Sequence, residues 1–449
     1  MAHVKKENTL LTNKNIFLFI NNESLNFEKI QHNEIEYIIN NFCGTTFNNL
    51  NDFNKYNCVA NYDSEHILYL CGNIKMIYEQ TILNSNQIIY VVPDMSYNYL
   101  TCNYKCKFID IGEIPINIYG LGIFFRNFFT TNKNYYNSIQ DEHKFNILTE
   151  SNKPSESYRK GIYITNVEIN NNNEIKYNLL RCSTNMNGPT DNFKNTDIEI
   201  INKVNNICNY FFEEKVNFNH VLAQTYENII TDHIEKKAKI KEHSDKTKDM
   251  PHNGLMAFCT FYKNNFNSSN NFNNFNNFNN VNFCCEDSTN IKKSKNDMFN
   301  YCFNGINIFT EIKFKLKKTV INNDTMIKEF NIILYPNSLF IMSLSTNRLY
   351  THEIKPSILP INKIPIRMGY VIRCSKTIAI YKNNKTYLYE NENENENNLI
   401  ELEKVNYINN NEIIKLKNLY YKENTSDEII NYDKIYFSLN NGDYLQPIL

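Results

Sequence analysis

The stretch IKEHSDKTKDM, residues 240–250, contains the one His-x-Asp sequence of the chain, His243 and Asp245. An imidazole and a carboxylate two residues apart on an extended segment can bind one Fe(II) ion if a distant histidine completes the set. Such a two-histidine, one-carboxylate site leaves positions open for a co-substrate and O2. Only His252 and His352 follow Asp245. His252 is expected on the same loop, whereas His352 follows a buried-looking strand and can approach from another part of the fold.

Two other pairs have the same spacing with glutamate as the acid. They are His32 with Glu34 and His233 with Glu235. Both occur in polar, helix-like contexts, where a solvated pair of charges is the ordinary interpretation. The sequence therefore favours His243-x-Asp245 as the start of a metal site.

Arginine is rare in this chain, and half of the arginine residues lie close to His352 in the sequence. Three of only six arginines fall within residues 348–373, namely Arg348, Arg367 and Arg373. Because lysine is the usual cation here, arginine suggests that a planar guanidinium is needed to pair with carboxylates. Arg367 and Arg373 are six residues apart on an expected strand, so their side chains leave the same face. They could anchor a dicarboxylate such as 2-oxoglutarate, although a surface ladder of cations is the alternative.

Three stretches together resemble the Fe(II)/2-oxoglutarate-dependent dioxygenases, and most closely the AlkB family. They are HSDKTKDM (243–250), SLFIMSLSTNRLYTHEI (338–354) and RMGYVIR (367–373). A fourth stretch, QTY (224–226), stands where that family has Asn-x-Tyr on the strand before His-x-Asp. The resemblance covers roughly residues 161–381 and does not include residues 1–150.

The resemblance implies a role for each of these residues. His243, Asp245 and His352 would be the catalytic set that holds Fe(II), with O2 at a remaining position. Arg367 would pair with the far carboxylate of 2-oxoglutarate, and Arg373 would lie closer to the iron. Gln224 and Tyr226 would contact the co-substrate. The implied reaction converts 2-oxoglutarate to succinate and CO2 while a substrate C–H bond is hydroxylated, and a hydroxylated N-methyl group is lost as formaldehyde.

The family likeness favours an alkylated nucleobase in DNA or RNA as the substrate. A net charge of −1 provides no global attraction to a polyanion, so nucleic acid would need a local basic patch. Arg181 and Lys194, around a possible substrate lid at 180–193, and the basic run KKAKIK (236–241) are candidates. An ordinary turn and a solvated loop are the alternatives. A protein side-chain hydroxylase or demethylase is a second enzyme hypothesis, and a degenerate barrel acting as a binding module is the non-enzyme hypothesis.

Many short apolar runs indicate a chain that is mostly β in its second half. A helix is expected from an N-cap at Thr196, with Glu199 completing a capping box. The expected fold is α+β: a double-stranded β-helix (jelly-roll) barrel with flanking helices, plus an N-terminal α/β-type module. The strands on which this expectation rests are 66–72, 86–95, 161–169, 175–182, 220–226, 254–262, 306–316, 330–335, 338–344 and 366–381.

The chain is expected to contain three parts. Residues 1–150 form a module without recognisable chemistry, and residues 161–385 form the dioxygenase barrel. An Asn-rich insertion at 263–300 is expected to interrupt the barrel. It is expected to be disordered, because such a composition cannot bury enough apolar surface to become ordered. Residues 386–449 form a C-terminal extension with a low-complexity start.

Composition suggests a chain with a real core and no membrane span. Hydrophobic residues make up 42%, yet no apolar run approaches the ~18 residues that a membrane helix needs. The 12 cysteines suggest reduced thiols in a cytoplasmic or nuclear compartment. Two cysteine pairs could be proposed as zinc ligands, but neither has CxxC…CxxC spacing. They are Cys102 with Cys106, and Cys284 with Cys285.

Overall fold

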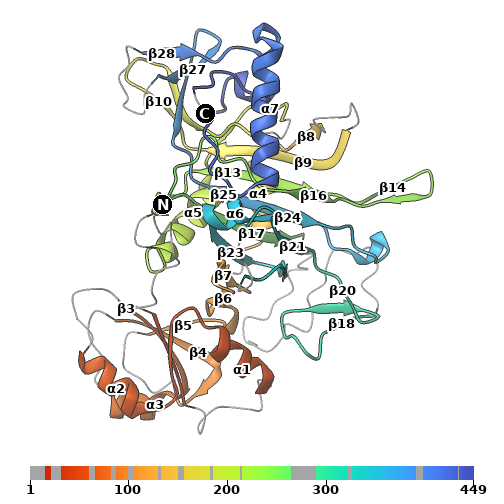
Figure 1. The fold of residues 1–449 in the computed structure, drawn as a ribbon. Helices are drawn as coiled ribbons and strands as arrows, with labels where there is room; N and C mark the ends of the chain where they lie inside the picture. The colour runs from red at the N-terminus through yellow and green to blue at the C-terminus, as the bar shows by residue number, and fades with distance from the viewer. Residues whose placement is uncertain are drawn as a thin grey trace. The chain divides into compact units, whose positions relative to one another are not determined.

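A computed structural model shows the fold of this chain (Figure 1). The residues that it describes are 16–21, 32–59, 66–81, 87–99, 106–129, 133–149, 156–182, 186–212, 215–263, 290–321, 326–390, 398–432 and 434–449. The chain divides into two compact units. The smaller consists of Met1–Thr130, Asn206–Glu214 and Asn337–Phe340, and the larger of the remaining residues. Each unit is described by itself.

The smaller unit contains a parallel sheet with the strand order β2-β1-β3-β4-β5. β1 is buried along its whole length, as a central parallel strand with both faces covered should be. The strands are β1 (Ile16–Ile20), β2 (Thr45–Phe47), β3 (His66–Asn73), β4 (Gln87–Tyr97) and β5 (Cys106–Phe108). The helices are α1 (His32–Asn41), α2 (Leu50–Val59) and α3 (Ile74–Gln80). A 3-10 turn (Ile111–Glu113) and an antiparallel hairpin, β6 (Ile116–Ile118) with β7 (Gly122–Phe125), complete it.

The main sheet of the larger unit is built around β13, which is buried at every residue. β13 pairs antiparallel with β9 on one side and with β25 on the other, and β17 follows β25. The strands are β8 (Asn146–Thr149), β9 (Glu156–Thr165), β12 (Asp191–Asn192), β13 (His220–Tyr226), β17 (Leu255–Tyr262) and β25 (Arg367–Arg373).

A second antiparallel sheet of the larger unit has the order β16-β24-β21-β22. Its strands are β16 (Ile240–His243), β21 (Glu311–Leu316), β22 (Glu329–Ile333) and β24 (Tyr350–Ile354). One cavity is lined by residues of both sheets, so the two sheets together position the site. No closed barrel is present among the described strands, and the jelly-roll barrel stays a prediction.

The remaining elements of the larger unit surround these sheets. A third sheet consists of β10 (Val167–Ile169), β11 (Ile175–Leu179), β26 (Thr377–Lys382), β27 (Lys385–Tyr389) and β28 (Leu399–Glu401). Small strands are β14 (Ile229–Thr231), β15 (Ile234–Lys236), β18 (Ile291–Lys293), β19 (Tyr301–Phe303) and β20 (Ile306–Asn307). Helices are α4 (Tyr135–Glu142), α5 (Asn195–Cys208, whose residues from Asn206 on belong to the smaller unit), α6 (Leu344–Leu349) and α7 (Asn410–Thr425), with 3-10 turns at Ile361–Lys363, Val405–Tyr407 and Asn441–Tyr444. β23 (Ser338–Ser343) has residues in each unit.

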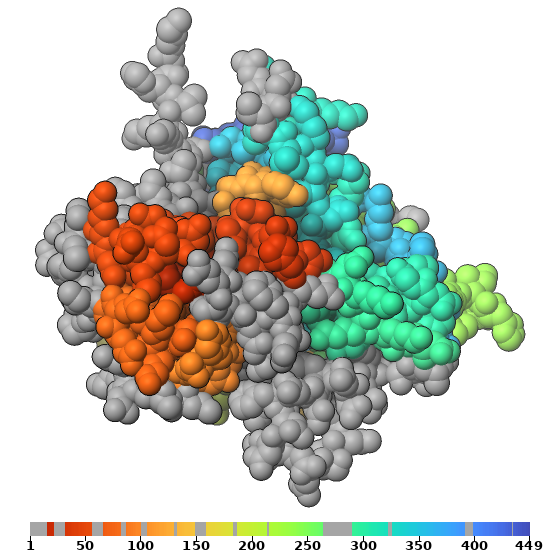
Figure 2. All heavy atoms as spheres, turned by 90° about the horizontal axis from the view of Figure 1, so that it is seen from below, coloured from red at the N-terminus to blue at the C-terminus, as the bar shows by residue number. Residues whose placement is uncertain are grey.

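The β14–β15 hairpin projects from the larger unit, and its tip stands out in the space-filling view (Figures 1 and 2). Asp232 and His233 form its turn with positive φ angles. The basic run KKAKIK therefore begins on a hairpin rather than on an unstructured loop.

Several sequence expectations differ from the structure. The compact units separate near residue 130, because α4 and β8 belong to the larger unit. The segment expected as a C-terminal extension also belongs to that unit, where β27 pairs with β26. The prediction that Thr196 is an N-cap was wrong. Helix α5 begins at Asn195, and the Thr196 hydroxyl donates a hydrogen bond to Glu142. Asp197 instead accepts a hydrogen bond from the backbone N–H of Lys194.

Some expectations fall on residues that are not described. These are Cys102, Cys284, Cys285, residues 264–289 of the Asn-rich insertion and residues 391–397 of the second low-complexity stretch. Among the helices that the structure does describe, none has the length and apolar character needed to cross a membrane.

Candidate functional site

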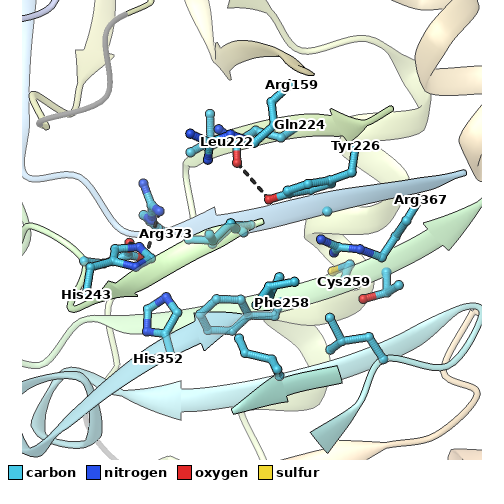
Figure 3. Close-up of a pocket in the computed structure, with 18 of the residues that line it drawn as sticks. Arg159, Leu222, Gln224, Tyr226, His243, Phe258, Cys259, His352, Arg367 and Arg373 are labelled. Atoms are coloured by element: carbon cyan, nitrogen blue, oxygen red, sulfur yellow. Dashed lines mark hydrogen bonds and ion pairs between the residues drawn. The ribbon is translucent and has the colours of Figure 1, made fainter. Parts of the chain in front are cut away.

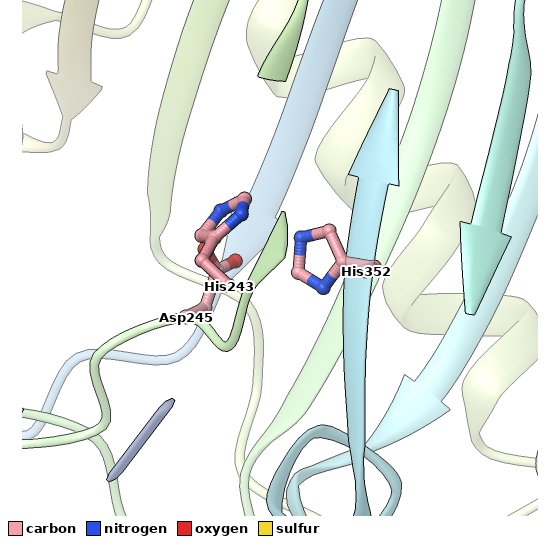
Figure 4. A group of neighbouring side chains, drawn as sticks. All are labelled: His243, Asp245 and His352. Atoms are coloured by element: carbon pink, nitrogen blue, oxygen red, sulfur yellow. The ribbon is translucent and has the colours of Figure 1, made fainter. Parts of the chain in front are cut away.

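His243 and His352 lie directly opposite each other on neighbouring antiparallel strands. β16 ends at His243, which pairs in register with His352 of β24, and the two ring centroids are 4.4 Å apart (Figure 4). Asp245 follows on the adjoining loop, with an Oδ1 3.5 Å from His243 Nε2. One ligand atom from each of these three residues lies within 4.8 Å of the others. This is the donor set of a facial metal site.

The competing histidines are placed differently. His252 is exposed and is not part of this group. His32 is exposed on α1, where its Nε2 lies 3.3 Å from Glu36. His233 is exposed at the turn of the β14–β15 hairpin. Of the histidines considered for the site, the structure brings His243 and His352 close to Asp245.

His352 is buried with an imidazole that is ready to act as a ligand. Burial, followed by the nearby charge of His243, lowers the pKa of His352 to about 3, so its ring is neutral at physiological pH. The ring centroids of Phe258 and Phe314 each lie 5.7 Å from the centroid of the His352 ring. Its Nδ1 is buried and has no hydrogen-bond partner among the described residues. An unsatisfied buried nitrogen costs free energy unless something binds it.

Asp245 is held ionised and oriented by its neighbours. Burial by itself raises the pKa of this carboxyl, but the guanidinium of Arg373 and the neighbouring histidines lower it well below its usual range. Arg373 Nη2 donates to Asp245 Oδ2 over 2.8 Å. His243 Nδ1 contacts the backbone oxygen of Lys241 at 2.8 Å, which directs Nε2 toward Asp245. A hydrogen bond of this kind fixes the tautomer and the ring orientation of a metal-binding histidine.

Arg367 and Arg373 leave the same face of β25, as expected, and both line the cavity (Figure 3). Arg367 is buried, and its Nε and Nη2 lack hydrogen-bond partners in the described part of the chain. Its guanidinium carbon lies 3.9 Å from the centroid of the Tyr226 ring. A buried guanidinium with two unsatisfied donors indicates a place for an anion, and a carboxylate fits that fork.

Gln224 and Tyr226 extend from β13 into the same cavity. The Tyr226 hydroxyl donates a 3.0 Å hydrogen bond to Gln224 Oε1 (Figure 3). Between the two arginines, Gly369 leaves room for these side chains. A Cβ on Gly369 would come within 3.1 Å of Arg367 Nη1 and 3.3 Å of the Tyr226 ring. The cavity measures about 90 Å³ and joins all seven residues expected from the sequence.

The basic residues considered for nucleic-acid contact differ in their burial and in their acidic partners. Arg181 is buried and forms a two-point ion pair with Asp249, with Nη2 2.6 Å from Oδ1. It is therefore a structural residue, and the phosphate role considered for it was wrong. Lys194 lies 3.5 Å from buried Asp191. In the basic run, Lys237 is paired with Glu235 at 3.1 Å.

Some residues around the site could not be found from the sequence. Cys182 and Cys259 line the cavity, and Phe258 packs beside His352. Asn347 binds the backbone of Asp245 through both its amide atoms, each at 2.9 Å. Nothing in the type or spacing of these residues marks them, because their importance comes only from the fold.

Comparison with known proteins does not identify the chain. No protein-family profile matches it, and no curated protein matches it. Among solved structures, a bsmA homolog from Methylobium petroleophilum matches with a TM-score of 0.25 and 8% identity, covering 54% of this chain and 81% of that one.

Proposed function

We propose that this chain is an Fe(II)- and 2-oxoglutarate-dependent dioxygenase of the AlkB-like type, and that it hydroxylates or demethylates its substrate. One observation carries the proposal. One cavity is lined by His243, Asp245 and His352, whose ligand atoms lie within 4.8 Å of one another, and by Arg367, whose buried Nε and Nη2 have no partners among the described residues. The three ligand residues suit a metal ion and the guanidinium suits a carboxylate, and this pairing supports the proposal of iron with an oxoacid.

The residues present fit both groups. His243, Asp245 and His352 would hold the metal, and Arg367 would hold the far carboxylate of 2-oxoglutarate beside Tyr226 and Gln224. When bound, the pair supplies O2-dependent oxidation of a substrate C–H bond, coupled to conversion of 2-oxoglutarate into succinate and CO2.

The chain's own residues prepare the site for this chemistry. Arg373 keeps the Asp245 carboxylate charged and fixes one of its oxygens. The carbonyl of Lys241 orients His243, and the rings of Phe258 and Phe314 keep water from His352. Pre-orientation and exclusion of water are the protein's part in cofactor-dependent oxidation.

The proposed substrate is an alkylated nucleobase in DNA or RNA, turned out of its stack to reach the cavity. This choice rests on the family likeness, with a protein side chain as the competing substrate. Eight described cysteines are free thiols, which fits the proposed location in the cytoplasm or nucleus.

Anaerobic addition of Fe(II) and 2-oxoglutarate tests the proposal directly. We expect a weak visible charge-transfer band in the wild type, and its loss in the Arg367→Met variant. Succinate formation with methylated oligonucleotides, compared with peptide pools, then separates the two substrate classes. A chain that shows no band and forms no succinate would be a binding module instead.

A further inference from the structure

We propose that the last turn of helix α7 is a positioning element for the metal ligands, with Asn424 and Glu423 as positioning residues. This inference rests on the proposed function, because it assigns a task to residues that hold the His243–Asp245 loop. It gives the C-terminal segment a part in the site, although no residue of α7 lines the cavity.

The loop that carries the ligands is held by side chains rather than by strand pairing. β16 ends at His243, so the backbone N–H groups beyond it need other acceptors. The N–H of Ser244, the residue between the two ligands, donates to Asn424 Oδ1 over 3.0 Å. The N–H of Thr247 donates to Glu423 Oε1 over 3.0 Å. Two of these backbone donors therefore depend on neighbouring residues of α7.

A buried lysine joins the same loop to the same helix turn. Lys246 Nζ donates to the Ser244 oxygen at 3.0 Å, to the Tyr420 oxygen at 3.1 Å and to Asn424 Oδ1. Glu423 lies 3.9 Å from this ammonium group. Lys246 and Glu423 are both buried, so their charges are little screened by solvent. The loop can move away from α7 only if several buried bonds break together.

The helix turn is itself fixed in place. Lys317 Nζ donates to the backbone oxygens of Glu423 at 2.7 Å and of Ser426 at 3.1 Å. A cation at a helix C-terminus is favourable because the last carbonyl groups carry partial negative charge. The second oxygen of Glu423 accepts a hydrogen bond from the Tyr432 hydroxyl. Glu423 and Asn424 thus present preset acceptors to the ligand loop.

The Asn424→Ala variant of the full chain tests this inference. It removes the acceptor of the Ser244 N–H while His243, Asp245 and His352 stay unchanged. We expect Co²⁺, titrated in place of iron and followed by visible absorption, to bind about tenfold more weakly, because outer partners of metal ligands typically contribute ~10–100-fold. Asn424→Asp keeps an acceptor oxygen and should recover most of the affinity.

A matched control lies on the same helix. Asn418 is exposed, so Asn418→Ala makes the same chemical change away from the loop and should bind Co²⁺ like the wild type. Thermal melting without metal identifies a variant that fails to fold, in which case the milder Asn424→Ser replaces alanine. Equal Co²⁺ affinity in wild type and folded Asn424 variants would overturn this inference alone. A wild type that binds no Co²⁺ would overturn the proposed function, and this inference with it.

Discussion

Among the described residues, two groups of histidine and carboxylate lie near opposite faces of strand β25, and their histidines differ in the partners of their ring nitrogens. His243, Asp245 and His352 form the first group, on the face from which Arg367 and Arg373 extend. Glu142, His143 and Asp197 form the second, and their ligand atoms are as close together as those of the first. It is linked to the other face of β25 by the Tyr370 hydroxyl, which donates to Asp197 over 2.7 Å.

The two groups differ in what their ring nitrogens contact. In the second group, His143 Nδ1 lies 2.8 Å from Asp191 and Nε2 lies 2.8 Å from Asp197. Burial alone would lower the pKa of His143, but its two carboxylate partners outweigh burial and raise the pKa to about 9. His143 is therefore a cation with both nitrogens occupied, whereas His352 is neutral and its buried Nδ1 has no hydrogen-bond partner in the described part of the chain. Proximity of donor types does not make a metal site unless a lone pair is available.

The largest expected effect is on stability, at the second group. His143→Gln leaves the buried carboxylates of Asp191 and Asp197 without their shared cation. Breaking a buried ion pair costs about 3–5 kcal/mol, and we expect the lower end because Lys194 remains near Asp191. Chemical denaturation should show this loss, while Co²⁺ affinity of the folded variant stays at the wild-type value. A fall in metal affinity would mean that the second group binds metal after all.

The same substitution at the first group should have the opposite outcome. His352→Gln removes one of the three ligands, and Co²⁺ affinity should fall by more than about 100-fold, beyond the effect of outer partners. Stability without metal should change little, because the buried Nδ1 that is lost has no partner within the described residues. Visible titration and denaturation of the two His→Gln variants test the comparison. It fails if both variants lose the same property.

The strands that form the site were largely foreseeable from the sequence. Expected strands at 220–226 and 254–262 are observed as β13 and β17, and RMGYVIR is β25. Their runs of apolar residues reflect burial, which the sequence records directly. The start of α5 was misjudged, because the Thr196 hydroxyl bonds to Glu142, a tertiary partner, while Asp197 accepts the backbone N–H of Lys194.

The candidate ligands were also foreseeable, but the second group and the α7 contacts were not. Rare residues at a recognisable spacing selected His243, Asp245 and Arg367 in a chain where the rival pairs use glutamate. His143, by contrast, is an isolated histidine whose partners lie 48 and 54 residues away. Asn424 is one asparagine among many, so only the tertiary fold distinguishes it.

A smaller effect on stability is expected from pH. The pKa of His143 is raised in the folded chain, so its stabilising contribution is fully present below the ordinary value of 6.5 and is lost as the pH rises through about 9. We expect a loss of roughly 2 kcal/mol between pH 7 and pH 10, less than the whole shift implies because Asp191 and Asp197 share the titration. Denaturation of wild type and His143→Gln at both pH values isolates this contribution. Equal pH slopes would contradict it.

The smallest effect is the stabilisation that the first group gains when metal binds. A ligand at about ten times its dissociation constant stabilises the folded state by about 1.4 kcal/mol, provided that it does not bind the unfolded chain. Co²⁺ should therefore raise the unfolding free energy of the wild type and of His143→Gln by the same amount. His352→Gln should show no increase. We expect the second group to stabilise the fold without metal, and the first to stabilise it only when metal is bound. Equal increases in the unfolding free energy of all three proteins would therefore mean that Co²⁺ binds at another place.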